Sequence, residues 1–138
     1  MSRFKSSCTS DTGLVTLDWS SGGLAEGLAC YRAAQFFEAH EHWEGVWLRL
    51  QEPEKSFLQS LVQVTAALHH FEAGNLIGAV SLLRRALNRL SRSPALFGGI
   101  EVAPLRAEIK GWLEAMESMP TVRPRDYPKI RPVNVRLD

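Results

Sequence analysis

The sequence lacks most of the features that identify a function directly. Its 138 residues include only two cysteines, Cys8 and Cys30, too few for a disulfide-rich secreted framework. No apolar run approaches the roughly 20 residues that a membrane-spanning helix needs. The chain also has no glycine-rich phosphate loop, nucleophile elbow or paired Cys-x-x-Cys motif. These absences set aside several catalytic classes and favour two ordinary thiols in a reducing compartment.

The sequence also lacks an excess of charge of either sign. It contains 16 Lys and Arg against 15 Asp and Glu, a formal net charge of +1, so no global field favours nucleic acid or a membrane surface. Residues 1–23 carry Arg3 and Lys5 but no apolar core of a secretory signal. They are rich in Ser and Thr, which leaves plastid import open, although no basic amphipathic face supports it. We expect a cytoplasmic protein.

What the chain does contain is helical periodicity within an ordinary globular composition, 45% hydrophobic and 22% charged. Apolar residues recur at three- and four-residue steps, no strand pattern competes, and Gly98 and Gly99 mark a loop. The connection Gly74-Asn75 is so short that the third and fourth helices must form an antiparallel hairpin. The predicted helices span about 24–34, 36–50, 54–73, 76–91 and 102–117.

These elements predict an all-α fold, a compact bundle of about five helices with a central antiparallel helical hairpin. The helical domain is expected at residues 23–119. Residues 1–22 are expected to be a flexible N-terminal segment. Residues 120–138 are expected to be an extended or disordered tail, because proline recurs there among arginine and lysine.

The candidate site lies on the second and third helices. His40 falls on the apolar face of the second helix, and Glu44, four residues on, is its neighbour on that helix. Glu41 points to the same flank. On the third helix, His69 takes an apolar-face position. If the two helices pack together, we expect His40, Glu41, Glu44 and His69 to meet in or beside the core.

Two interpretations of this cluster remain open. In the first, His40, Glu44 and His69 bind a divalent metal such as zinc, manganese or iron, and Glu41 activates a bound water in a hydrolase. In the second, the side chains satisfy one another as a buried structural network, and the domain is a non-enzymatic binding module. Gln59 and Gln63, four apart on the third helix, either bond the neighbouring helix backbone or face solvent.

Arginines form a basic strip on the fourth helix. Arg84, Arg85 and Arg89 are balanced by the acidic second helix, so a solvated face is the simplest interpretation. Together with the basic tail, the strip is also a candidate contact for phosphate or nucleic acid, whose binding would weaken steeply with salt. The protein partner, if there is one, is not specified by the sequence.

Three motifs occur together between Phe36 and Leu90. They are Phe37-Glu38-Ala39-His40-Glu41 followed by Trp43-Glu44 and Trp47, then Gln59 and Gln63 followed by His69, and finally Gly74-Asn75. This combination resembles the family numbered 309 among the domains of unknown function, in outline over most of residues 24–116. The resemblance implies a small all-α domain without an established activity. It places the family's characteristic polar residues at His40, Glu41, Glu44, Gln59 and His69, and Ser60 where the family usually has Gly.

Overall fold

The structure is a computed structural model that describes residues 17–118 and 126–133. Within these residues the chain forms five helices and one small two-stranded sheet, so the predicted all-α class is confirmed. The predicted helices are all present, and their ends differ by at most a few residues. The helices are α1 (Gly22–Arg32), α2 (Phe36–Trp47), α3 (Glu54–Glu72), α4 (Leu76–Leu90) and α5 (Val102–Ser118).

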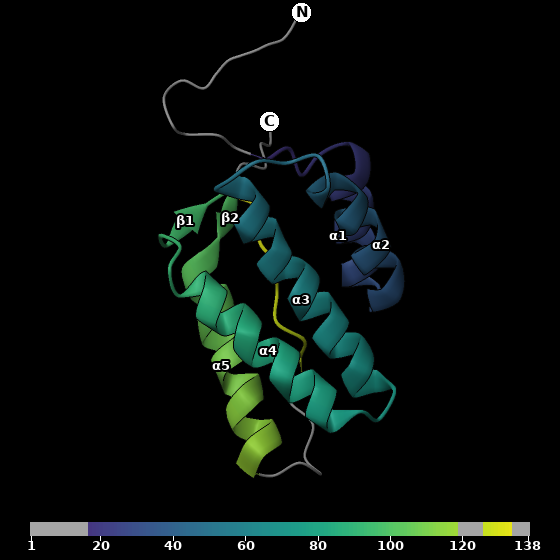
Figure 1. The fold of residues 1–138 in the computed structure, drawn as a ribbon, viewed down its shortest axis with the longest axis vertical. Helices are drawn as coiled ribbons and strands as arrows, with labels where there is room; N and C mark the ends of the chain where they lie inside the picture. Colours follow the sequence, from purple (N-terminus) through teal and green to yellow (C-terminus); the bar gives the residue numbers. More distant parts are fainter. Residues whose placement is uncertain (1–16, 119–125, 134–138) are drawn as a thin grey trace, which may run out of the picture.

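The central hairpin of α3 and α4 forms as the sequence predicts. Gly74 ends α3 with a φ of 86°, a left-handed conformation that glycine adopts without steric cost. Asn75 then caps α4, because its side-chain oxygen accepts a hydrogen bond of 3.0 Å from the amide of Gly78. The two helices therefore run antiparallel in the middle of the molecule (Figure 1).

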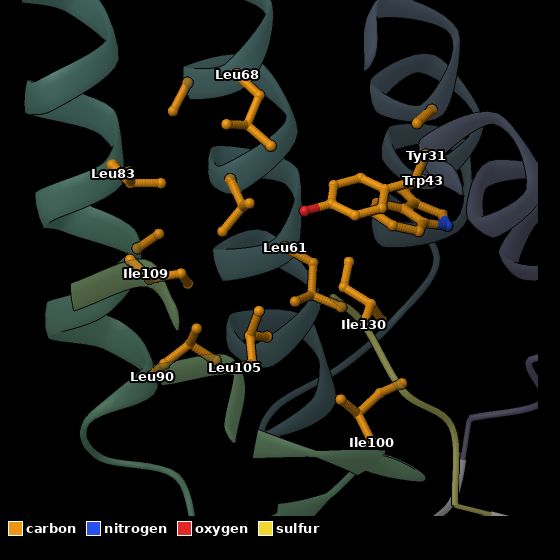
Figure 2. Packing of buried hydrophobic residues seen from close by; sticks show 14 of the residues in the cluster. Tyr31, Trp43, Leu61, Leu68, Leu83, Leu90, Ile100, Leu105, Ile109 and Ile130 are labelled. Carbon is orange, nitrogen blue, oxygen red and sulfur yellow. The ribbon is translucent and has the colours of Figure 1, made fainter. Parts of the chain in front are cut away.

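Helix α3 lies at the centre of the arrangement. The pair α1 and α2 covers one side of it, and α4 with α5 behind it covers the other (Figure 1). Because α3 is covered on both sides, its buried residues occupy a broad face instead of one narrow stripe. Figure 2 shows the resulting core, in which Trp43 stacks on Tyr31 at a ring-centroid distance of 6.0 Å. Other core residues labelled there are Leu61, Leu68, Leu83, Leu90, Leu105 and Ile109.

A small β-hairpin stands where the sequence predicts only a loop. Strands β1 (Leu96–Phe97) and β2 (Ile100–Glu101) pair antiparallel, and the turn between them consists of Gly98 and Gly99 at φ values of 60° and 79°. The indole of Trp19 donates a hydrogen bond of 2.8 Å to the carbonyl of Gly98. The expectation that no strand occurs is therefore wrong, because two-residue strands are too short to show an alternating pattern.

The hydrophobic core extends beyond residues 23–119. Leu17 and Trp19 are buried in it, as is Ile130. Residues 126–133, which we call the C-terminal strap, are extended as expected, yet they pack against the helices (Figure 2). The predictions for residues 1–16, 120–125 and 134–138 lie outside the described residues, as does Cys8.

In the described ranges, none of the helices has both the length and the hydropathy needed to cross a membrane.

Candidate functional sites

Helix α2 presents two different faces. Phe36, Ala39 and Trp43 recur at three- and four-residue steps and are buried. On the outer flank, Glu41 and Glu44 are exposed, and Phe37 is 50% exposed although it is aromatic. Helix α2 thus packs with Phe36 and Trp43 inward, while Glu41, Glu44 and part of Phe37 face solvent.

The predicted His and Glu cluster lies on the surface. The His40 side chain is 29% exposed, and its Nδ1 atom lies 3.9 Å from Oε1 of Glu44, whose side chain is 52% exposed. His69 is exposed on the last turn of α3, where its ring centroid lies 5.7 Å from that of Phe37. The expectation of a buried cluster is wrong, because Glu41, Glu44 and His69 are exposed and His40 is only partly buried.

The structure places the predicted residues in two separate contacts, His40 with Glu44 and His69 with Phe37. In the described parts of the chain, no three His, Cys, Asp or Glu side chains are grouped so that they could hold a metal ion. A zinc, manganese or iron site normally needs at least three protein ligands. The assignment of His40, Glu44 and His69 as ligands, with Glu41 as base, therefore stays a prediction from the sequence.

Two buried polar atoms on α2 and α3 have no hydrogen-bond partner among the described residues. They are Nε1 of Trp47 and Oε1 of Gln63. The ammonium group of Lys55 lies 4.6 Å from the centroid of the Trp47 ring, a cation–π contact. Gln59, like Gln63, is half-buried. The predicted roles of Gln59 and Gln63, a bond to the neighbouring backbone or solvation, stay predictions.

The outer face of α4 carries a shallow hollow of about 910 Å³. The described residues that line it belong to α4, including Val80, Leu87 and Asn88, or are its C-cap residue Ser91. Ile77 in the first turn is 85% exposed, the most exposed of the large hydrophobic side chains in the described residues. We did not predict this surface. The sequence does contain a sign of it. Ile77 and Val80 are apolar, yet their spacing places them outside the buried stripe of Ala79, Leu83, Ala86 and Leu90.

The arginines of α4 border this hollow only in part. Arg84 and Arg85 line it and are exposed, and Arg84 forms an ion pair with Glu117 of α5. Arg89 contributes to lowering the pKa of Glu52, which is held down chiefly by a hydrogen bond with Ser56. Helix α3 lies between α2 and α4 (Figure 1), so the carboxylates within α2 do not balance these arginines, whereas Glu52, beyond the end of α2, is close enough to Arg89 to be affected by it.

These observations define a small all-α domain with a central helical hairpin and an amphipathic face on α4 that the other described residues leave exposed. Residues 24–82 match the family described as "Domain of unknown function (DUF309)", which confirms the resemblance seen in the sequence. The buried Ser60 fits without disturbing the helices, since its hydroxyl donates to the carbonyl of Phe57 within α3 at 2.5 Å.

One relative is an uncharacterized protein of Aquifex aeolicus (strain VF5). It is 30% identical over 95 residues, which make up 68% of this chain and 28% of the relative. The chain thus spans less than a third of that relative's length, and the match carries no information about activity.

Proposed function

We propose that this domain is a non-enzymatic protein-binding module, and that the outer face of α4 is its docking surface for an acidic amphipathic helix. The observation that carries the proposal is the exposure of Ile77, at 85%, beside a hollow that Val80 and Leu87 help to line. Aliphatic side chains that gather on an exposed face mark interaction surfaces when polar residues border them.

The positive charge of this face favours an acidic partner. Arg84 and Arg85 lie next to each other at the edge of the apolar hollow. A guanidinium group binds carboxylates through paired hydrogen bonds, so acidic side chains on a partner helix would complement it. The apolar residues of such a partner helix, at every third or fourth position, would fill the hollow.

The test uses a synthetic amphipathic peptide with leucines at helical spacing and glutamates on the flanks. Fluorescence anisotropy should detect binding to the wild-type chain. The double variant Arg84→Glu and Arg85→Glu should bind at least about tenfold more weakly, because two like-charge contacts replace two attractive ones. Ile77→Ser should weaken binding by a similar factor without changing its salt dependence.

Arg49→Glu is the matched control, since Arg49 is an exposed arginine near the end of α2 and away from the hollow. It should bind as the wild type does. His40→Ala should also bind normally, and it tests whether the His40 and Glu44 pair only stabilises the fold. If a short RNA or DNA duplex binds in an Arg84- and Arg85-dependent way and the acidic peptide does not, the strip is a nucleic-acid contact and the proposal is wrong.

The alternative proposal is a metal-dependent hydrolase that uses His40, Glu44 and His69 as ligands and Glu41 as base. It is supported by the sequence spacing and by the proximity of His40 to Glu44. Thermal unfolding of chelator-treated protein should then shift upward with zinc, manganese or iron(II), and Glu41→Gln should keep the shift but lose turnover. Unchanged melting with all three metals would rule this alternative out.

A further inference from the structure

The C-terminal strap, residues 126–133, is held in a cleft between α1 and α5 much as a bound peptide is held by a receptor. The strap follows α5 in sequence but is separated from it by residues 119–125. Its described main-chain hydrogen bonds all join it to other elements. Figure 2 shows the strap running beside the core, with Ile130 turned towards Leu61 of α3.

Side chains of α1 and α5 form hydrogen bonds with the main chain of the first half of the strap. The indole of Trp112 donates to the carbonyl of Asp126 at 2.8 Å, and the hydroxyl of Tyr31 donates to the carbonyl of Pro128 at 2.5 Å. The amide of Lys129 donates to Oε1 of Glu108 at 2.7 Å. Contacts of this kind depend on an extended backbone and not on the side chains of the segment that is bound.

The β-hairpin holds the second half. The amide of Glu101 donates to the carbonyl of Arg131 at 3.0 Å, and the amide of Val133 donates to the carbonyl of Gly99 at 2.8 Å. Pro132 forms an antiparallel bridge with Ile100. The strap thus ends with an isolated antiparallel bridge at the edge of the hairpin, a contact related to the way in which sheet edges bind extended peptides.

Several side chains of the strap also make specific contacts. Tyr127 stacks on Trp112 at a ring-centroid distance of 5.4 Å. Ile130 is 3% exposed and belongs to the hydrophobic core, so it acts as an anchor. The guanidinium of Arg131 donates to Oε2 of Glu108 at 2.7 Å. In this part of the strap, an aliphatic residue followed by a basic residue therefore fits the cleft.

Two hollows that are open to solvent lie beside the strap. A hollow of about 410 Å³ remains on the side of α5, next to Glu108 and Trp112. Another of about 320 Å³ remains on the side of α1, next to Tyr31 and Arg32.

We propose that the cleft between α1 and α5 is a second binding groove, for an extended peptide with an aliphatic anchor followed by a basic residue. The strap is its occupant in cis, and a peptide of the same pattern from another protein displaces it. The tether keeps the strap at a high effective concentration, so displacement requires a competing peptide that binds more tightly or is abundant. This proposal is independent of the α4 surface.

The experiment uses the full chain and a fluorescent peptide with the sequence of residues 126–133. Ile130→Asp should expel the strap from the cleft, since an ionised carboxylate has no partner in the core. The labelled peptide should then bind this variant at least about tenfold more tightly than it binds the wild type, whose own strap competes. Val133→Asp is the matched control, because Val133 is an exposed strap residue, and it should bind the peptide as weakly as the wild type.

A peptide that carries Asp in place of Ile130 should not bind any of these proteins. If Ile130→Asp keeps its helical circular dichroism yet fails to bind the wild-type peptide, the groove proposal is overturned. Hydrogen exchange on the wild type decides the matter if that variant does not fold. The amides of Lys129 and Val133 should exchange faster than those of α3 by openings that leave the helices intact. Exchange of both amides only by global unfolding would mean that the strap is a fixed part of the fold.

Discussion

Gly27 of α1 lies directly against the indole of Trp43 of α2. A Cβ atom at Gly27 would overlap the Nε1, Cδ1 and Cε2 atoms of that ring. The indole is fixed in place because its Nε1 donates a hydrogen bond of 3.1 Å to the carbonyl of Leu24, and the whole side chain is buried. The close approach of α1 and α2 therefore depends on the absence of a side chain at residue 27.

Gly27→Ala should lower the free energy of unfolding by about 1–3 kcal/mol, the usual cost of overpacking a well-filled core. Gly111→Ala is the matched control, since Gly111 also lies inside a helix but has no atom within 4 Å of an added Cβ. It should stabilise the protein by about 0.5–1 kcal/mol, because alanine favours helix over glycine. Urea denaturation measures both changes, and equal effects of the two substitutions would contradict the packing argument.

Asn75→Ala should destabilise the protein by about 1 kcal/mol through loss of the cap on α4. The variant leaves the amide of Gly78 without the oxygen that it now contacts at 3.0 Å. Asn75→Asp keeps an acceptor at this position and should retain most of the stability, since aspartate is an equally good N-cap. The comparison is made by urea denaturation at neutral pH, and equal losses in both variants would show that the cap is not the cause.

Tyr31 should make the protein sensitive to alkaline pH. Burial raises the pKa of its hydroxyl well above the ordinary tyrosine value, and the negative charge of Glu108 adds to the effect. Above about pH 10 the unfolded chain loses this proton while the folded chain keeps it. The unfolded state then binds fewer protons, so the free energy of unfolding falls as pH rises.

The measurement is the urea midpoint between pH 8 and pH 11 for the wild type and for Tyr31→Phe. The variant should be less stable at pH 8, because the carbonyl of Pro128 loses its donor. Its stability should then fall less steeply with pH than that of the wild type. Parallel pH profiles would show that Tyr31 does not carry the alkaline sensitivity, since the lysines and Tyr127 are common to both proteins.

The sequence was sufficient to predict the helices, because the residues that mark helix ends act locally. Pro53, Gly74 and Asn75 mark ends that depend only on neighbouring residues. The burial of the strap was not predictable in the same way. Ile130 stands among prolines and basic residues, and nothing near it in the sequence shows that α1 and α5 leave a cleft for it.

The candidate site shows the same limit. The spacing of His40 and Glu44 correctly predicts that they are neighbours. His69 was placed inward because it follows Thr65 by four residues, and Thr65 is indeed buried. The prediction of burial fails at the last turn of α3. Periodicity shows which side of a helix faces inward, but not which turns of that side a neighbouring element covers.

The strap also affects the order in which the chain can fold during synthesis. Its bond to Tyr31 joins residues 97 positions apart, and the contact of Trp19 with Gly98 spans 79. The hairpin of α3 and α4 needs only local contacts and can form while the chain is still growing. The bond between Tyr31 and Pro128 cannot form until the strap has emerged from the ribosome, so α1 and α5 are joined last.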